Sequence, residues 1–195
     1  AVKSFTQHLK VQQDTSINSA FPLVNFNNWT SNNARVFTVS AGQYPLLRWD
    51  LQSFQGQKAT AAGVLELTTE SVQKGGNYIA ALGEDFGIEF DKVRVFEILG
   101  GDKNWQQDTV TYASFTQGKD LQSTINGQMI FDTEVAQANG KTLVTIPRPV
   151  LQRLLDGTTH GLLLQPLGAL EVSFYDSEHG DGSQAATLHF STSAH

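Results

Sequence analysis

The segment that decides the fold is Ile146-Pro-Arg-Pro-Val-Leu-Gln-Arg-Leu-Leu-Asp-Gly-Thr-Thr-His-Gly-Leu-Leu-Leu164. Proline is tolerated in the first turn of a helix, and a glycine such as Gly157 is typical of the position just after a helix ends. The apolar side chains between them share one helix face: Val150, Leu151, Leu154 and Leu155. The segment therefore predicts one short helix near 149–155, followed at once by a strand over 161–165.

The rest of the chain reads as strands separated by turns. Glycine-containing turn signals such as Asn126-Gly127 and Asn139-Gly140 fall between short apolar runs, and Ala61–Thr68 alternates as a half-buried strand does. The expected strands are 5–12, 34–39, 44–51, 61–68, 90–98, 129–133, 142–146, 161–165, 170–175 and 186–191. About ten strands with one helix predict an all-β fold, a two-sheet antiparallel β-sandwich of the jelly-roll type.

The loops between the strands are the first place to look for a binding site. Three long irregular segments are expected, at 18–33, 75–87 and 100–128. Long loops in a compact β-domain often bind ligands. No repeat, linker or block of like charge divides the chain, so residues 1–195 read as a single domain.

The composition narrows the classes of function. The 195 residues carry a net charge of -6, which argues against nucleic acid as a partner because phosphate binding needs a basic surface. No apolar run approaches the roughly 20 residues of a membrane-spanning helix. Cysteine is absent, so thiolate zinc sites and thiol nucleophiles are excluded. The low charged fraction of 16%, with abundant Asn, Ser, Thr and Gly, favours a secreted or cell-surface protein.

Four segments, taken in order, resemble the DNRLRE-type carbohydrate-binding modules, which are β-sandwich accessory domains of secreted polysaccharide-degrading proteins. They are Asp14-Thr-Ser-Ile-Asn-Ser-Ala-Phe-Pro-Leu-Val-Asn-Phe-Asn27, Leu46-Leu-Arg-Trp-Asp-Leu51, Val95-Phe-Glu-Ile98 with Trp105 and Thr109-Val-Thr-Tyr112, and 149–164 with 174–178. The chain departs from the family pattern at Gln107, where an acid is usual. The resemblance implies a sugar-binding module of a larger multidomain protein, with a polysaccharide as its partner.

A calcium site is one interpretation of the acidic loop Asp176-Ser-Glu-His-Gly-Asp181. Ca²⁺ takes six to eight oxygen ligands, often from one acidic loop and a distant carboxylate. In a jelly roll the first and last strands often pair, which would bring Asp14 close to Glu178. The candidate ligands of a structural Ca²⁺ are thus Asp14, Asp176, Glu178 and Asp181. The alternative is a solvated loop that uses Asp and Gly for its turns.

Aromatic and basic side chains are the candidate sugar contacts. Sugar rings stack on aromatic rings that have one wet face, and Trp29 lies in a wholly polar stretch. Tyr44 and Tyr112 are weaker candidates of the same kind. Arg48 interrupts the strongest apolar strand, so it either binds a sugar carboxylate or sulfate or forms an ion pair with Asp50 or Glu66.

Charge partners for an acidic polymer such as alginate would be Arg35, Arg48 and Lys58. Trp49 and Trp105 are expected to pack in the structure rather than to bind. A second acidic cluster at 84–91 contains Glu89 and Asp91, which are the residue types of a glycosidase pair or simply a polar sheet face.

Three functions remain open on the sequence. The resemblance favours a noncatalytic carbohydrate-binding module, and no Gly-x-Ser-x-Gly, His-x-x-x-His or phosphate-loop pattern points to an enzyme. A jelly-roll polysaccharide lyase or glycoside hydrolase would show a Tyr-His-Arg or two-carboxylate groove. A structural or adhesion domain would show a large apolar surface patch.

Overall fold

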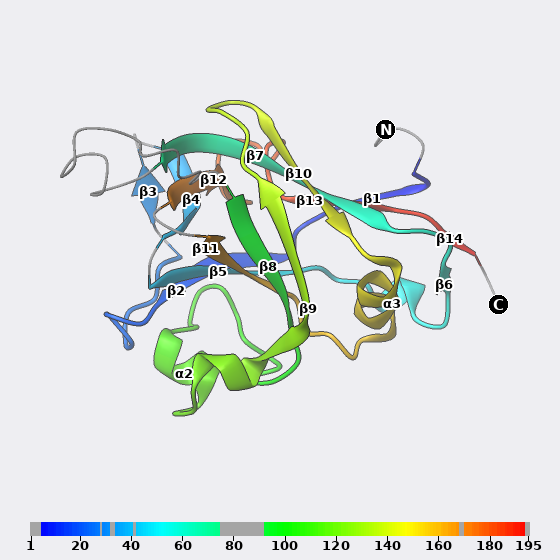
Figure 1. Cartoon of the computed structure of the whole chain (residues 1–195), viewed down its shortest axis with the longest axis horizontal. Coiled ribbons are helices and arrows are strands. Elements are labelled where there is room, and N and C mark those ends of the chain that lie inside the picture. Colours follow the sequence, from blue (N-terminus) through cyan, green and yellow to red (C-terminus); the bar gives the residue numbers. More distant parts are fainter. Residues whose placement is uncertain are drawn as a thin grey trace.

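The computed structural model describes residues 5–27, 29–31, 34–40, 42–74, 92–167 and 170–193. Within these ranges the chain forms two antiparallel sheets that pack against each other, as the sequence predicts (Figure 1). Several successive strands lie in alternate sheets, as in a jelly roll. None of the helices described is long and apolar enough to cross a membrane. The predicted acidic cluster at 84–91 and the predicted loop at 75–87 lie outside the described residues.

The larger sheet has seven strands. Its main order is β1 (Gln7–Lys10), β13 (Thr187–Phe190), β7 (Gly63–Lys74), β12 (Leu170–Tyr175), β4 (Ala34–Val39) and β3 (Thr30–Ser31), and β10 (Lys141–Ile146) also pairs with β7. The smaller sheet has the order β2 (Gln13–Asn18), β5 (Gln43–Arg48), β11 (Leu162–Leu167), β8 (Lys92–Ile98) and β9 (Ile125–Glu134). A short pair, β6 (Lys58–Ala59) and β14 (Thr192–Ser193), lies beside them.

The predicted helix near 149–155 is confirmed as α3 (Arg148–Asp156). Gly157 adopts a left-handed conformation at its end, and the four predicted apolar side chains are buried. Figure 1 shows α3 at one end of the sandwich, beside β6. A helix placed there closes the open end of the core between the sheets.

The middle of the smaller sheet is buried on both faces. Leu162 and Leu164 of β11 pack in the core between the sheets, whereas Leu163 packs in a second core on the outer face. A strand that is covered on both sides reads as a continuous apolar run rather than as an alternation. The Leu-Leu-Leu run at 162–164 is therefore the signature of a doubly covered strand.

The second core is built by the segment expected to be an irregular loop. Residues 99–124 contain a short helix, α2 (Tyr112–Thr116), and a 3₁₀ turn at Leu121–Thr124. Another 3₁₀ turn lies elsewhere in the described chain, at Gln52–Phe54. Thr111 and Ser114 form a reciprocal capping box at the start of α2, and Phe115 is fully buried. Most of the segment at 100–128 is consequently a cover for the sheet rather than a free binding loop.

The N-terminal part of the chain also differs from the expectation. The single strand expected over 5–12 is two strands, β1 in the larger sheet and β2 in the smaller one. The chain changes sheet at Val11, whose N–H donates to the Ala186 carbonyl at 2.8 Å. The predicted pairing of the first and last long strands is confirmed by the antiparallel contact of β1 with β13.

Candidate functional site

A pocket of about 320 Å³ lies where the end of β5, the segment after β8 and the C-terminal end of α3 meet. The register of β5 and β11 explains its position, because the pairing of Leu47 with Leu162 brings Arg48 opposite Gly161, the residue next to His160. Gly161 permits this close approach. A Cβ atom there would lie 2.2 Å from the Leu47 carbonyl oxygen, and its φ of +118° also favours glycine. We call this cavity the Arg48 pocket.

Arg48 is held at the wall of this pocket, and it forms no ion pair with any residue that the structure describes. Its guanidinium carbon lies 4.8 Å from the centre of the Trp105 ring, and Nη1 donates to the Lys103 carbonyl at 3.3 Å. Burial lowers the pKa of Arg48, and the nearby Asp102 acts in the opposite direction. The alternative of an ion pair with Asp50 or Glu66 is not what the structure has, because Asp50 accepts from the Gln52 N–H and Glu66 contacts His189. Asp102 is near enough to act on Arg48, but no salt bridge joins these two described side chains, and Trp105 holds the guanidinium in place.

Two further basic side chains, Lys103 and His160, line the Arg48 pocket. Burial lowers the pKa of His160, and the positive charges of Lys103 and Arg48 lower it further. No carboxylate is among the lining residues that the structure describes. The side-chain amides of Gln52 and Gln55 add uncharged polar groups.

Trp49 forms part of the same wall. Its side chain is buried, as predicted, but its indole N–H finds no acceptor among the described residues. A buried donor without an acceptor typically costs about 1–3 kcal/mol. An oxygen atom from a ligand that reached this donor would recover part of that cost.

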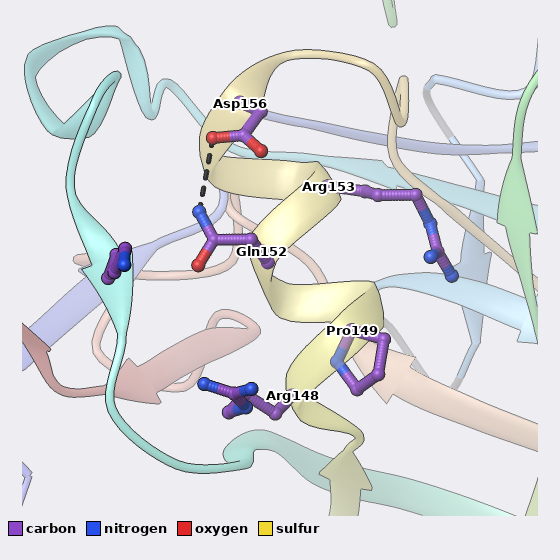
Figure 2. A pocket seen from close by; sticks show the side chains of 6 residues that line it. Arg148, Pro149, Gln152, Arg153 and Asp156 are labelled. Atoms are coloured by element: carbon purple, nitrogen blue, oxygen red, sulfur yellow. Dashed lines mark hydrogen bonds between the residues drawn. The ribbon is translucent and has the colours of Figure 1, made fainter.

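A second pocket, of about 550 Å³, lies between α3 and β6 and contains Lys58 and Arg148 (Figure 2). Several of its polar side chains form hydrogen bonds within the protein. Gln152 accepts from the Ala59 N–H at 2.8 Å and donates to Asp156 at 3.1 Å, and Arg148 donates to the Ala59 carbonyl at 3.4 Å. This pocket therefore works mainly as the joint that fastens β6 to α3.

The remaining arginine of that pocket, Arg153, extends to the other side of α3 (Figure 2). It forms a salt bridge with Glu97, which is fully buried and also accepts from Thr159 at 2.6 Å and Asn126 at 3.0 Å. Burial opposes ionisation of Glu97, but these hydrogen bonds lower its pKa overall. The pair anchors α3 to β8 and leaves the Arg153 charge balanced.

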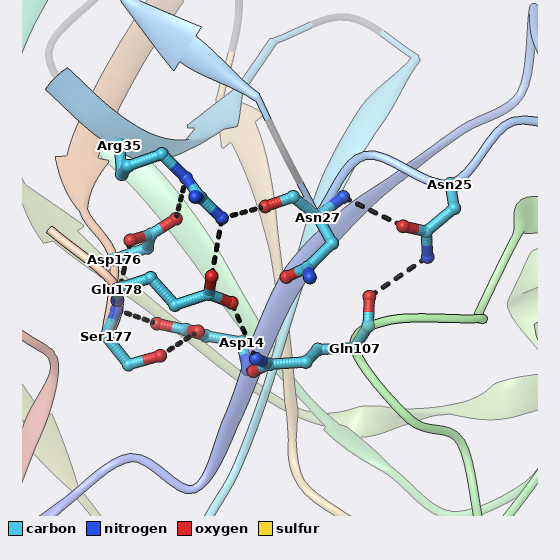
Figure 3. Close-up of polar contacts among 8 residues, drawn as sticks. All are labelled: Asp14, Asn25, Asn27, Arg35, Gln107, Asp176, Ser177 and Glu178. Atoms are coloured by element: carbon cyan, nitrogen blue, oxygen red, sulfur yellow. Dashed lines mark hydrogen bonds and ion pairs between the residues drawn. The ribbon is translucent and has the colours of Figure 1, made fainter.

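A third polar site lies at the end of the sandwich where β2, β4 and β12 come together, and we call it the Arg35 cluster (Figure 3). Arg35 donates to Glu178 at 2.7 Å and to the Asn27 carbonyl at 2.7 Å, and it lies 3.9 Å from Asp176. Gln107 donates to the other oxygen of Glu178 at 2.8 Å. The Arg35 charge is thus matched by carboxylates of the chain itself.

Asp14 is the buried member of this cluster. Its two oxygens accept from the Ser177 hydroxyl at 2.7 Å and from the Ser177 backbone N–H at 2.8 Å. Burial raises the pKa of Asp14 to about 7; Asp176 and Glu178 act in the same direction, and the Ser177 hydrogen bonds oppose them. Burial also raises the pKa of Asp176.

The four predicted calcium ligands are only partly brought together. Asp14, Asp176 and Glu178 meet in the Arg35 cluster, but the exposed Asp181 instead caps its own turn by accepting from the Ser183 N–H at 2.9 Å. In the described ranges, no group of three or more His, Asp or Glu side chains is arranged to hold a metal ion. The guanidinium of Arg35 lies where a cation would balance the carboxylates, and calcium binding stays a prediction.

The predicted aromatic contacts do not gather at one site. Trp29 is 38% exposed, and its indole N–H donates to Thr38 at 2.9 Å on the outer side of β4. Tyr44 and Tyr112 pack at the edge of the second core, where burial raises the pKa of Tyr112. Of the predicted sugar contacts among the described residues, Arg48 lines the pocket of about 320 Å³ and Lys58 lines the pocket of about 550 Å³, whereas Trp29, Tyr44, Tyr112 and Arg35 line neither.

Sequence reasoning missed three members of the Arg48 pocket. Lys103 and His160 were not proposed as binding residues, and Trp49 was assigned to packing alone. The sequence did contain a signal for part of this pocket. One apolar strand ends at Arg48-Trp49, and another begins just after Thr159-His160. If the two strands pair antiparallel, these residues come together.

A comparison of the chain with protein-family models finds no match, and a comparison with curated proteins finds no significant one.

Proposed function

We propose that this chain is a noncatalytic carbohydrate-binding module that recognises a polysaccharide carrying carboxylate or sulfate groups. The observation that supports it is the Arg48 pocket, in which Arg48 and Lys103 line one concave surface together with His160, and none of the described residues that line this pocket is a carboxylate. Cations that line a pocket without a lining carboxylate attract an anionic group.

The shape and lining of the pocket fit a sugar residue. Its volume of about 320 Å³ lies at the small end of the range for ligand sites. Trp49 contributes apolar surface, and the amides of Gln52 and Gln55 are the groups that pair with sugar hydroxyls. An acidic sugar would place its anionic group toward Arg48 and its hydroxyls toward the amides.

The proposal includes the resemblance to accessory modules of secreted polysaccharide-degrading proteins. In that context the chain would be one module of a larger secreted or cell-surface protein. A single pocket gives modest affinity, and several such sites on one polymer would raise the retention of the whole protein.

A panel of oligosaccharides tests the function. Isothermal titration with an alginate oligosaccharide, a sulfated oligosaccharide and an uncharged glucan of similar length is expected to give binding to at least one acidic ligand and none to the glucan. Binding confined to the uncharged glucan, or absent throughout, would overturn the proposal.

The same incubations separate binding from catalysis. A lyase would release unsaturated ends from the acidic polymer, and a hydrolase would release reducing ends. The pocket contains Arg48 and His160, but no tyrosine is among the described residues that line it. We therefore expect neither product to accumulate, and accumulation of either would replace the binding proposal with the enzymatic alternative.

A second candidate function, adhesion to another protein, rests on the loop after β2. Phe21, Leu23 and Val24 are 57%, 81% and 45% exposed on this loop. The loop is attached to α2, because the Ala113 N–H donates to the Pro22 carbonyl at 2.9 Å. If this surface mediates self-association, light scattering should show concentration-dependent assembly that a Phe21→Ser/Leu23→Ser variant loses. A monomer at every concentration would count against that form of adhesion.

A further inference from the structure

Two histidines face each other across the contact of the first and last long strands. His8 on β1 and His189 on β13 are directly opposed in the antiparallel register. Their Nδ1 atoms are 2.6 Å apart, and the ring planes meet at 68°. This pair lies in the larger sheet, and neither residue lines the Arg48 pocket.

A carboxylate fixes the orientation of one of the two rings. The Nε2 atom of His189 lies 3.1 Å from an oxygen of Glu66 on the neighbouring strand β7. An ionised Glu66 accepts a hydrogen bond, so it places the proton of a neutral His189 on Nε2. The Nδ1 atom of His189 then presents a lone pair toward His8.

The 2.6 Å between the two Nδ1 atoms is short even for an N–H···N hydrogen bond, so a proton of His8 fits between them in this structure. A metal ion would take the place of that proton, and the two nitrogens would then move apart. Imidazole nitrogen is a preferred ligand of Zn²⁺ and of related divalent ions such as Cu²⁺. A carboxylate on the far nitrogen of a histidine is the usual outer partner of such a ligand, since it fixes the ring and raises its basicity.

We propose that His8 and His189 form a two-imidazole site for a divalent transition-metal ion such as Zn²⁺, with Glu66 as the positioning residue for His189. Zinc–nitrogen bonds of about 2.0–2.1 Å at a tetrahedral angle separate the two nitrogens by about 3.3 Å. The exposed His8 side chain reaches that separation with a movement of less than about 1 Å, whereas His189 is 6% exposed and stays fixed. Water completes the coordination.

A metal ion bound by His8 and His189 would link the strands near the two ends of the described chain. His8 lies on β1, a four-residue strand at the edge of the sheet, and His189 lies on the strand next to it. A metal ion that joins both residues binds the paired strands and not the unfolded chain. Bound Zn²⁺ therefore raises the melting temperature and holds β1 against β13.

Zinc titration of the untagged protein at neutral pH tests the proposal by calorimetry and by thermal melting. We expect one equivalent of Zn²⁺ to bind, the melting temperature to rise, and His8→Ala to lose at least tenfold in affinity. His8 is exposed, so this variant is expected to fold. Glu66→Gln should weaken binding by roughly tenfold, within the range typical of outer-shell partners.

His179→Ala is the matched control, because His179 stacks on Tyr175 in the loop after β12 and is not part of the pair. It is expected to bind Zn²⁺ as the unaltered protein does. Zinc affinity that His8→Ala leaves unchanged, or that is lost in His179→Ala instead, would overturn the site, and so would no binding at millimolar Zn²⁺. Glycan binding should be unaffected by zinc, so this result is separate from the fate of the proposed function.

Discussion

The Arg35 cluster and the Arg48 pocket each hold an arginine that sequence analysis selected, yet the two arginines have opposite surroundings. Arg35 contacts Glu178 at 2.7 Å and lies near Asp176. Arg48 lies over Trp105 and lines a cavity with two more basic side chains. A charge that the chain neutralises itself belongs to the fold, whereas a charge that is held in place and left open is available to a ligand.

The first way to sharpen this comparison is to break a matched charge that belongs to the fold. Glu97→Gln weakens the salt bridge of Arg153 and disturbs the hydrogen bonds from Thr159 and Asn126. Arg153 is 35% exposed and stays partly solvated, so the expected cost is about 1.5–3 kcal/mol, the contribution of hydrogen bonds to a charged group. Urea unfolding should show a loss of that order; Asp132→Asn, at the surface pair with Arg94, is the control and should cost less than about 1 kcal/mol. Equal losses would contradict the distinction.

The pH dependence of stability tests the buried carboxyl of the Arg35 cluster. The folded pKa of Asp14 is raised to about 7, so its favourable contribution is complete below the ordinary value of 3.8 and is lost as the pH rises toward 7. The upper limit of the change is about 4 kcal/mol, from about three pKa units.

Asp14→Asn is the variant that isolates this effect. Unfolding free energies of the unaltered protein are expected to fall between about pH 4 and pH 7, and the variant should lack most of that slope. Identical slopes in the two proteins would show that Asp14 does not titrate in this range.

The two arginines should separate stability from binding. Arg48→Gln is expected to lower affinity for the acidic oligosaccharide by roughly 10-fold to 100-fold, because a charge-assisted hydrogen bond contributes about 1.5–3 kcal/mol. Arg35→Gln should leave that affinity within about twofold and should destabilise the fold, since it leaves carboxylates unpaired. Calorimetry measures the affinity of both variants, and urea unfolding measures their stability. A loss of affinity in Arg35→Gln with none in Arg48→Gln would contradict the proposed roles.

A smaller effect is expected from His160. Its pKa lies below the ordinary value because of burial and its basic neighbours, and a bound anion would raise it. Affinity for the acidic ligand should therefore increase severalfold as the pH falls below the ordinary histidine pKa of about 6.5. His160→Gln should remove the increase, and a pH profile that is the same in both proteins would exclude His160 from the site.

Calcium gives the smallest expected change. The Arg35 guanidinium already balances Glu178 and Asp176, so a Ca²⁺ ion would have to compete with it and keep Asp14 ionised. If the predicted site is real, the melting temperature rises with Ca²⁺ at pH 8, falls with chelator, and loses this response in Asp14→Asn. If the melting temperature does not shift in any of these conditions, Arg35 alone balances the charge of the carboxylates.

The fold was largely predictable because its signals are local or periodic. The proline, glycine and apolar face of α3 lie within one short segment, and the alternation of Leu65 and Leu67 marks a buried strand face. The proximity of Asp14 to Glu178 was predicted from the pairing of the first and last strands, but Asp14 lies on β2 in the smaller sheet and reaches this loop through its hydrogen bonds with Ser177. The five-residue helix α2 was missed because it is too short to show a helical period.

The Arg48 pocket was less predictable because its residues come from three separate segments. Arg48 stood out as a charge in an apolar strand, but Lys103 and His160 have ordinary sequence surroundings. Their meeting depends on the register of β5 with β11 and on the absence of a Cβ at Gly161. A sequence pattern gives the strands, whereas a register between them requires the packed structure.

The most direct measurement uses the three tryptophans as reporters, because Trp49 and Trp105 lie at the Arg48 pocket and Trp29 lies on the outer side of β4. Indole N–H signals can be followed by NMR during titration with the acidic oligosaccharide, after assignment with single Trp→Phe variants. Our account predicts that the Trp49 and Trp105 signals move together with saturation while the Trp29 signal stays in place. Movement of Trp29 alone would contradict it.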